Sequence, residues 1–514
     1  MKKVIIIGAG PAGLTAGLEL LRQSGEYSVT VLEKSDTVGG ISRTAVHNGN
    51  RMDMGGHRFF SKDERVNRWW ESLMPNQGSP SADDIITNTK KELDGSADPE
   101  TQDKVFLKRR RVSRIYFKKK FFDYPVTVKP QTFINMGLRS TVKSVFSYGI
   151  SMVHKKNEDN LENFYINRFG KELYSMFFES YTEKLWGRHP RDISADWGAQ
   201  RVKGLSVTAL LKDIIQKATG KKSDETSLIE EFKYPKFGPG QMWQAAADEL
   251  VNHGGKIIFS AEVKKIHSEN GNISSVEYEK NGENITLSGD IFISSMAIKD
   301  LINGFDGCPD NVQKIADNLP YRDFLTVGLL VDRLAVKNET KLKTVGDIIP
   351  DCWIYVQDRS VKLGRVQIFN NWSPYMVKDF KNTVFLGLEY FCREGDGLWT
   401  MSDCELRDLA EKELVEIGIL NAGNVRDYHV ERVEKAYPAY FDSYDELPVV
   451  INYLNAFDNL FCVGRNGQHR YNNMDHSMAT AFCAVDNVLS GNTDKTALWS
   501  VNTEKEYHEE KRNG

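Results

Sequence analysis

Three glycines near the start of the sequence indicate a binding site for a dinucleotide. Gly8, Gly10 and Gly13 form a G-x-G-x-x-G pattern between a β-branched run and leucines at helical spacing. Glycine at these positions lets the backbone approach a pyrophosphate, and the N-terminus of the following helix stabilises its charge. Glu33 lies twenty residues after Gly13, at the end of the next predicted strand, where its carboxylate can accept hydrogen bonds from ribose hydroxyls.

The rest of the sequence contains no other motif with the spacing of a known catalytic centre or metal site. The six cysteines form no C-x-x-C pair and the ten histidines form no H-E-x-x-H motif, so we predict neither a metal nor a disulfide framework. No Ser-His-Asp, Cys-His or carboxylate pair stands out. We therefore expect a bound cofactor to supply the chemistry, and the single glycine fingerprint predicts one flavin or one nicotinamide.

Length and composition predict a globular protein of two or three lobes. A chain of 514 residues exceeds the ~250–300 residues at which a single core stops growing. Its net charge of -4 is spread without large blocks, which argues against nucleic acid as a partner. The longest apolar runs are shorter than the ~18 residues of a membrane helix, so we expect no integral membrane segment. These features together favour a cytoplasmic location.

The glycine motif must be positioned by a strand, a tight turn and a helix over residues 1–23, with the next strand of a βαβ unit at 27–36. Residues 76–104 are polar and are expected to form an exposed excursion, and residues 113–126 a hairpin around Lys118–Lys120. Residues 130–218 have helical spacing. Further strands are expected at 256–266, 273–289, 291–296, 324–332, 353–358, 366–373 and 383–391, and residues 459–489 read as a strand, a loop and a long helix.

Two segments after the glycine motif indicate that the dinucleotide is FAD. "LEKSDTVGGISRT" and "DMGGHRFF" resemble the FAD-binding start of the amine oxidase, protoporphyrinogen oxidase and UDP-galactopyranose mutase superfamily. The resemblance places Gly39, Gly40, Ser42 and Arg43 on the diphosphate side of FAD. It places Gly55, Gly56 and His57 at the isoalloxazine. The other contacts that it implies near the cofactor are Pro11, Ala12, Lys34 and Val263.

Within that superfamily the sequence most resembles UDP-galactopyranose mutase, in blocks scattered from end to end. "ENFYINRFGKELYSMFFESYTEKLWGRHP" is similar to the uridine-binding segment of the family, in which Tyr181, Thr182 and Trp186 would hold the uracil. "ADWGAQRVKG" resembles the stretch with an arginine that closes on the substrate diphosphate, here Arg201. "KAYPAY" and "LPYRDF" also have counterparts. They add Tyr437 and Tyr321 to the expected substrate contacts.

The C-terminal block "VGRNGQHRYNNMDHSMATA" resembles the most specific mutase motif. The resemblance implies that Gly464, Arg465, Met474 and Asp475 bind the flavin. It also implies that Arg470, Tyr471 and Asn473 face the sugar nucleotide. Asn473 replaces the aspartate of the bacterial mutases.

The resemblance implies an α/β fold with a Rossmann-type FAD-binding domain (GR2-like), an inserted helical lobe and a β-sheet substrate domain. The expected segments of the FAD-binding domain are residues 1–75, 223–300 and 441–500. The other expected parts are an excursion with a basic hairpin at 76–130, a helical substrate lobe at 131–222, a β-rich substrate domain at 301–440 and a tail at 501–514.

The activity implied is interconversion of a UDP-hexopyranose and a UDP-hexofuranose through the N5 atom of reduced FAD, for cell-surface polysaccharide synthesis. His57, Arg201 and Arg470 would be the catalytic residues, the substrate a nucleotide sugar, and an external reductant would keep the flavin competent. The sequence leaves homo-oligomerisation open.

Two features leave alternatives open. The stretch Leu329–Asp332 stands where eukaryotic mutases carry a second diphosphate arginine, and Arg322, Arg333 and Arg365 are the candidates to replace it. An FAD-dependent oxidoreductase of the amine oxidase or protoporphyrinogen oxidase type therefore remains the second hypothesis for the function, and a non-catalytic flavoprotein the third.

The basic run of residues 108–120 has two interpretations. It forms either a solvated hairpin edge or a binding site for an anionic membrane or a nucleotide.

Overall fold

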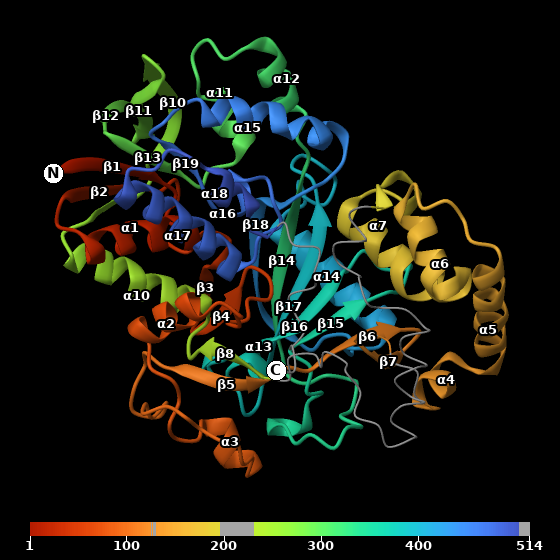
Figure 1. The fold of residues 1–514 in the computed structure, drawn as a ribbon. Helices are drawn as coiled ribbons and strands as arrows, with labels where there is room; N and C mark the ends of the chain where they lie inside the picture. The colour runs from red at the N-terminus through yellow and green to blue at the C-terminus, as the bar shows by residue number, and fades with distance from the viewer. Residues whose placement is uncertain (125, 127–129, 196–230, 503–514) are drawn as a thin grey trace, which may run out of the picture.

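A parallel five-stranded sheet forms the first lobe. The structure is a computed structural model that describes residues 1–124, 126, 130–195 and 231–502 (Figure 1). The strand order is β19-β13-β1-β2-β9, and every neighbouring pair is parallel. Its strands come from three distant parts of the chain: β1 (Lys2–Ile7), β2 (Tyr27–Leu32), β9 (Lys256–Ile258), β13 (Ile291–Ser294) and β19 (Leu460–Cys462).

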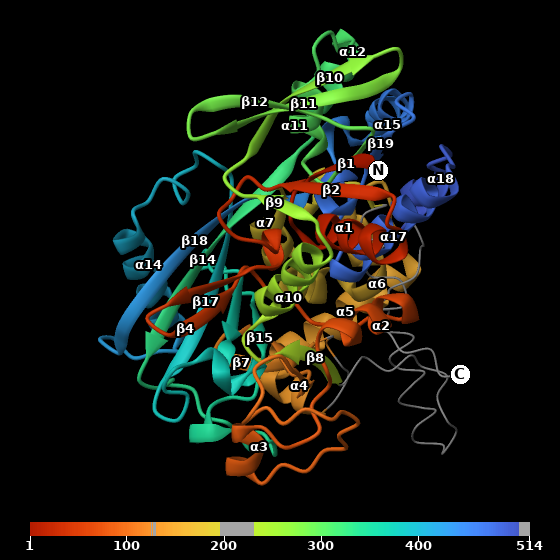
Figure 2. The ribbon, with the colours of Figure 1, turned by 90° about the vertical axis from the view of Figure 1, so that its left-hand side faces the viewer.

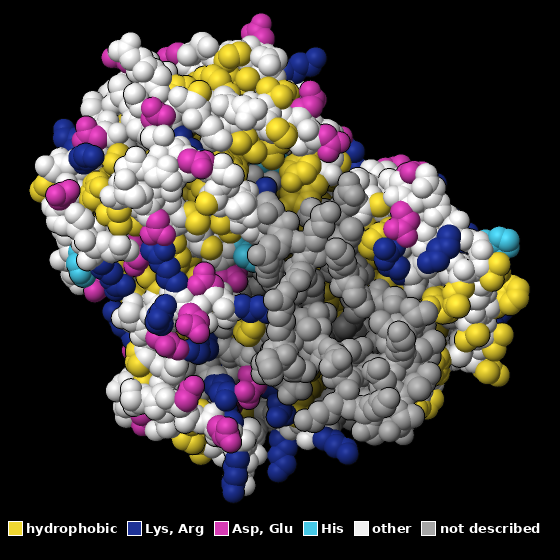
Figure 3. Space-filling model, viewed as in Figure 1, with side chains coloured by type: hydrophobic (Ala, Val, Ile, Leu, Met, Phe, Trp, Pro, Cys, Tyr) yellow, Lys and Arg dark blue, Asp and Glu magenta, His cyan; other side chains and the backbone are white. Residues whose placement is uncertain are grey.

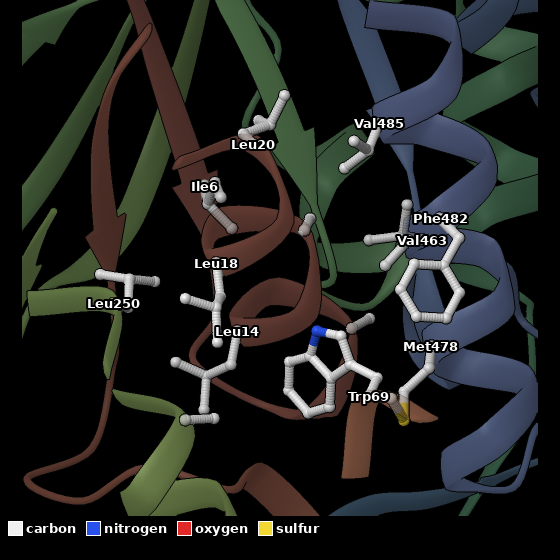
Figure 4. Close-up of a cluster of buried hydrophobic side chains, with 14 of the residues drawn as sticks. Ile6, Leu14, Leu18, Leu20, Trp69, Leu250, Val463, Met478, Phe482 and Val485 are labelled. Atoms are coloured by element: carbon white, nitrogen blue, oxygen red, sulfur yellow. The ribbon is translucent and has the colours of Figure 1, made fainter. Parts of the chain in front are cut away.

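Three helices pack on one face of this sheet and build the core on that side. They are α1 (Pro11–Gln23), α10 (Pro239–Asn252) and α17 (Met474–Ser490). Leu14, Leu18 and Leu20 of α1 are buried in one cluster with Leu250 of α10 and with Met478, Phe482 and Val485 of α17 (Figure 4). Figure 2 shows α1 and α17 side by side, although the two helices lie more than 450 residues apart in the sequence. The two ends of the chain therefore share one hydrophobic core.

A seven-stranded sheet forms the second large unit, in the order β18-β14-β17-β16-β15-β6-β7. Its pairs are antiparallel except for β15 with β6. Every residue of β17 is buried, and α14 (Asp403–Ile417) packs over the sheet. The strands are β6 (Ser113–Phe117), β7 (Lys120–Asp123), β14 (Tyr321–Val331), β15 (Trp353–Val356), β16 (Arg365–Ile368), β17 (Val384–Cys392) and β18 (Val425–Pro438).

The predicted basic hairpin is confirmed as β6 and β7, and it forms the edge of this sheet. Lys118 and Lys119 occupy the turn with positive φ, and both side chains are exposed. The preceding excursion differs from the expectation of an exposed segment. It contains α3 (Ala82–Thr87), and the carboxylate of Asp84 is buried where it accepts hydrogen bonds from Ser81 and Gln77.

Helices continue through residue 186 in the region predicted to be helical. They are α4 (Pro130–Met136), α5 (Leu138–Val153), α6 (Leu161–Tyr174) and α7 (Ser180–Trp186), with the π-helical turn η2 (Ser175–Glu179) between α6 and α7. The Asn160 side chain caps α6 by accepting from the backbone N–H of Asn163. Residues 196–230, and with them Arg201, lie outside the described residues.

Smaller elements complete the fold. The additional strands are β3 (Thr44–His47), β4 (Asn50–Asp53), β5 (Phe106–Arg110), β8 (Glu231–Pro235), β10 (Glu262–Glu269), β11 (Asn272–Lys280) and β12 (Glu283–Ser288). The additional helices are α2 (Glu64–Leu73), α11 (Ile298–Asn303), α12 (Asp310–Asp317), α13 (Phe369–Trp372), α15 (Leu447–Asn455), α16 (Gly464–Gly467) and α18 (Thr496–Ser500). In the part of the chain that the structure describes, no helix combines the length and apolar character needed to cross a bilayer.

Replacing Leu18 by alanine tests the shared core of the two chain ends. Leu18 is fully buried in α1, so Leu18→Ala is expected to lower the free energy of unfolding by about 2–5 kcal/mol. The exposed Ile85 of α3 is the control, and Ile85→Ala should change stability by less than about 0.5 kcal/mol. Urea unfolding followed by tryptophan fluorescence measures both. Equal losses in the two variants would contradict the placement of α1 in the core.

Candidate active site

One cavity of about 700 Å³ is lined by all three units of the structure. The parallel-sheet lobe contributes the glycine turn, Glu33 and the loop at the start of α17. The helical lobe contributes α6, η2 and α7, and the large sheet contributes side chains from β15, β16, β17 and β18. A site that needs groups from all three units can therefore form here.

The glycine turn is shaped by close backbone contacts. A Cβ atom on Gly13 would lie 1.9 Å from the carbonyl oxygen of Gly8, and Gly8 itself has a φ of +98°. Gly10 lines the cavity, and the nearest atom to its Cβ position is 3.8 Å away. Pro11 and Ala12, the first residues of α1, also line the cavity. The backbone is thus open to a ligand at Gly10 and close-packed on either side of it.

Glu33 is held beside this turn. Its carboxylate accepts hydrogen bonds from the backbone N–H of Ala9 at 2.6 Å and from the N–H of Ser35 at 2.9 Å. Lys34, also on the cavity wall, forms ion pairs with Glu262 and Glu434 at 3.4 and 3.6 Å. Glu33 therefore reaches the cavity in a fixed position.

Gly40 and Ser42 line the cavity, whereas Gly39 and Arg43 do not. Gly39 and Gly40 both have positive φ. The Arg43 guanidinium donates to the Gly40 carbonyl at 3.3 Å and pairs with Glu431 at 3.2 Å, lining a separate pocket of about 220 Å³. Its position therefore braces the loop against β18.

The loop from Met54 to His57 forms another part of the wall. Gly55 has a φ of +93°, and a Cβ on Gly56 would lie 3.3 Å from the Trp372 ring. The His57 Nε2 lies 3.0 Å from the Met54 carbonyl, which can only accept, so this nitrogen carries the proton. Burial, together with the guanidiniums of Arg465 and Arg365, lowers the pKa of His57 to about 4. His57 is therefore neutral at pH 7.

The predicted uridine-binding segment contributes two of its three expected residues to the cavity wall. Tyr181 and Thr182 line it, and the Tyr181 ring packs edge-on against Tyr355 and Phe391, with centroids 5.4 and 6.2 Å apart. Trp186 is instead buried in the core against Phe441. Trp186 thus anchors the segment to the hydrophobic core and does not contact the cavity.

The C-terminal block lines the cavity beside the start of α1, where a Cβ atom on Gly464 would lie 3.0 Å from the Cβ of Ala12. Arg465 donates to the backbone carbonyls of Asn472 and Ala436 at 2.8 and 2.9 Å, and its guanidinium lies 4.7 Å from the Tyr471 ring centroid. Arg470 donates to the carbonyls of Trp499 and Val501 at 2.7 and 2.8 Å. The remaining predicted residues on this wall are Gly464, Tyr471, Asn473, Met474 and Asp475.

Asn473 has a structural role at the same place. It is the N-cap residue of α17, and its backbone N–H lies 3.3 Å from the His476 Nδ1. An aspartate could serve as N-cap equally well. The replacement of the bacterial aspartate by Asn473 therefore keeps the helix start and removes a negative charge.

Arg365 is the one of the three candidate arginines that lines the cavity. Its guanidinium donates to the Tyr437 hydroxyl at 2.5 Å and forms an ion pair with Glu389 at 2.5 Å. The Tyr437 ring stacks on the Tyr471 ring, with centroids 5.6 Å apart and an angle of 17° between the ring planes. Arg322 instead donates to the carbonyls of Leu185 and Lys184, and Arg333 is exposed on a loop.

Other expected residues lie off the wall, and some residues on it were not predicted. Val263 and Tyr321 are packed in the hydrophobic cluster that includes Ile266, so neither lines the cavity. Tyr355, Gln367, Glu389 and Tyr440 line it without having been predicted. A signal was present for Gln367: it follows Arg365 by two residues in a strand, so both side chains point to the same face.

Comparison with known proteins identifies the fold. Residues 6–73 match the family described as NAD(P)-binding Rossmann-like domain. Over 39 residues the chain is 67% identical to "Lysine-specific histone demethylase 1 homolog 3" of Arabidopsis thaliana, a match that spans 8% of this chain and 2% of that protein. A structure of reduced UDP-galactopyranose mutase superposes with a TM-score of 0.75 at 21% identity, covering 98% of this chain and 100% of that one. The chain shares the fold of UDP-galactopyranose mutase.

The same fold occurs in proteins with other activities. A putrescine oxidase structure gives a TM-score of 0.55 at 14% identity, covering 95% and 99% of the two chains. A CLA-producing fatty acid isomerase from P. acnes superposes with a TM-score of 0.52 at 14% identity, covering 95% of this chain and 98% of that one. The predicted α/β class with a Rossmann-type domain and a β-sheet domain is confirmed. The reaction is not fixed by the fold.

The protonation of His57 can be measured directly. With ¹³C-labelled histidine, the His57 resonance should stay at its neutral position through pH 7 and then shift with a midpoint at about pH 4, and His57→Gln identifies it by removing it. The unfolded chain takes up this proton near pH 6.5, so the histidine's contribution to stability falls as the pH drops from about 6.5 to about 4. A midpoint close to 6.5 in the folded protein would overturn the assignment of a neutral, buried ring.

Proposed function

We propose that this chain is an FAD-dependent nucleotide-sugar mutase that interconverts a UDP-hexopyranose and a UDP-hexofuranose. The observation that carries the proposal is a single cavity with two unlike walls. A dinucleotide cradle forms one wall, and arginines with stacked tyrosines form the other. The full-length similarity of fold to UDP-galactopyranose mutase supports it.

The first wall fits FAD. The opening at Gly10, the N-terminus of α1 and the carboxylate of Glu33 match a pyrophosphate and a ribose. Asp475 and Met474, at the start of α17, would hold the ribityl and pyrimidine side. Reduced FAD bound at this wall would supply a nucleophilic nitrogen, N5, for reaction at the anomeric carbon of the sugar.

The second wall fits the nucleoside diphosphate that must leave and return. Arg365 and Arg470 supply guanidiniums, and Tyr437 and Tyr471 supply hydroxyls, to the oxygens of the diphosphate. Tyr181 and Tyr355 offer aromatic faces to the uracil. Arg201 is proposed to close on the diphosphate, as the sequence resemblance implies. Together these residues keep the leaving group within reach while the sugar is rearranged.

His57 is proposed to act as a neutral hydrogen-bonding group beside the flavin. Its Nε2–H is donated to the Met54 carbonyl, which leaves Nδ1 as an acceptor. A neutral ring adds no positive charge to those of Arg465 and Arg365. The loop can then change its hydrogen bonds as the redox state of a flavin changes.

The cellular setting belongs to the same proposal. All six cysteines are free, as in proteins of a reducing cytoplasm. An external reductant would keep the flavin reduced, and the product would serve cell-surface polysaccharide synthesis.

A second candidate function is oxidation of an apolar substrate or an amine. Where the helical lobe lines the cavity, the wall consists largely of aromatic and aliphatic side chains, among them Phe169, Leu173 and Phe177. Putrescine oxidase also shares the fold. The two functions make opposite demands on the flavin, because an oxidase begins its cycle oxidised.

Turnover of UDP-galactopyranose separates the candidates. Anaerobic protein with dithionite should convert it to a new UDP-hexofuranose seen by chromatography, and protein without dithionite should not. Bleaching of the oxidised flavin by an amine, without that product, would establish the oxidase instead. A flavin spectrum with neither reaction, on any nucleotide sugar or amine tested, would favour the non-catalytic reading.

We expect substitution of Arg365 to lower kcat/KM and substitution of Arg333 to leave it unchanged. Arg365→Lys keeps the charge beside Glu389 and loses the planar fork, so kcat/KM is expected to fall about 10- to 100-fold. Arg333→Lys is the matched control, because Arg333 is exposed and lies off the cavity wall. Steady-state kinetics with reduced enzyme measure both. Similar values for the two variants would remove Arg365 from the proposed diphosphate site.

A further inference from the structure

Helix α5 has its polar and apolar faces reversed relative to an ordinary surface helix. Ser144 and Ser151 are buried, whereas the large apolar residues of the opposite face are between 60% and 82% exposed. These exposed residues are Leu138, Val142, Val145, Phe146 and Val153. At 100° per residue, all five lie on one side of the helix and the serines on the other. A surface helix normally turns its apolar side to the core.

The neighbouring helix α6 explains why α5 cannot rotate. A Cβ atom on Gly170 of α6 would lie 2.8 Å from the backbone nitrogen of Tyr148 and 3.0 Å from the carbonyl carbon of Ser147. The two backbones are therefore in close contact, which small side chains such as serine permit. Phenylalanine and valine would not fit on this face. The apolar face of α5 is thus held outward by packing.

The exposed apolar surface continues beyond one helix face. Phe133 and Ile134 of α4, and Ile150 and Met152 of α5, are also exposed. Figure 3 shows hydrophobic side chains gathered at the right-hand edge of the molecule, where Figure 1 places α5, far from the parallel sheet. Contiguous apolar surface of this kind marks a site of interaction.

Within the segment that forms this surface, the charged side chains have one sign. Residues 130–157 contain no aspartate or glutamate, and their basic residues Arg139, Lys143, Lys155 and Lys156 are all exposed. Arg139 and Lys143 lie one turn apart beside the apolar stripe. A two-fold contact with a second copy would bring these basic residues toward their equivalents. An anionic lipid surface complements both the apolar stripe and its basic margin.

From these observations we infer that the α4–α5 face docks on the surface of a membrane that contains anionic lipid. A helix of 16 residues is about 24 Å long, which is less than the ~30 Å hydrocarbon core. The helix would therefore lie in the interface with Val142, Val145 and Phe146 among the acyl chains.

Vesicle flotation with the full-length protein tests this inference. The protein should float with vesicles of equal parts phosphatidylcholine and phosphatidylglycerol, and much less with pure phosphatidylcholine. The triple variant Val142→Ser, Val145→Ser, Phe146→Ser should lower the partition coefficient at least about tenfold. Arg139→Gln with Lys143→Gln should lower it several-fold at low salt and little at high salt.

A matched triple variant shows whether the position of the apolar residues matters. Val46→Ser, Ile85→Ser and Val251→Ser remove three similarly exposed apolar side chains from other faces, and binding should be unchanged. Circular dichroism melting confirms that each variant is folded. No flotation of the wild type, or equal flotation of both triple variants, would overturn the proposal. A dimer that dissociates in the α5 variant, without vesicle binding, would assign the face to a second copy and also overturn it.

Discussion

The close contact between Gly8 and Gly13 is the constraint on which the rest of the site depends. Strand β1 must turn into α1 so tightly that the Gly8 carbonyl occupies the place of a Gly13 side chain. The turn directs the N-terminus of α1 into the cavity and leaves Gly10 uncovered. It also brings the N–H of Ala9 to the carboxylate of Glu33, which fixes the end of β2. One backbone contact thus sets the positions of both the positive and the negative groups expected around a dinucleotide.

The opposite wall is built by a different principle. Its groups come from strands of the large sheet and from the segment before α17, and they hold one another through side chains. Glu389 forms an ion pair with Arg365 and accepts a hydrogen bond from Gln367, while Tyr437 lies between Arg365 and Tyr471. A carboxylate already neutralises much of the charge of Arg365. An anionic ligand at this wall would therefore have to share that guanidinium with Glu389, which favours a ligand that is bound and released over one that is retained.

The sequence predicted elements with strong local signals and missed groups that depend on tertiary packing. The turn at Gly8–Gly13, the hairpin at Lys118–Lys120 and the other strands of the large sheet except β18 follow from periodicity and turn chemistry. Trp186 and Arg43 were expected on the cavity wall because of their motifs, yet packing against Phe441 and pairing with Glu431 place them behind it. Tyr355 and Glu389 could not be predicted, since their neighbours in space come from distant strands. Alternation in residues 365–368 could have paired Gln367 with Arg365.

The three-part origin of the parallel sheet has a consequence for how the chain is made. Strand β13 lies between β1 and β19, and β19 begins at Leu460. During synthesis, β1 and α1 emerge more than 450 residues before α17, the helix that covers them. The large sheet and the helical lobe have their partners nearer in sequence and can be assembled earlier. Strand β1 and helix α1 are therefore expected to be among the last elements to reach their native packing, and to need protection from aggregation in the meantime.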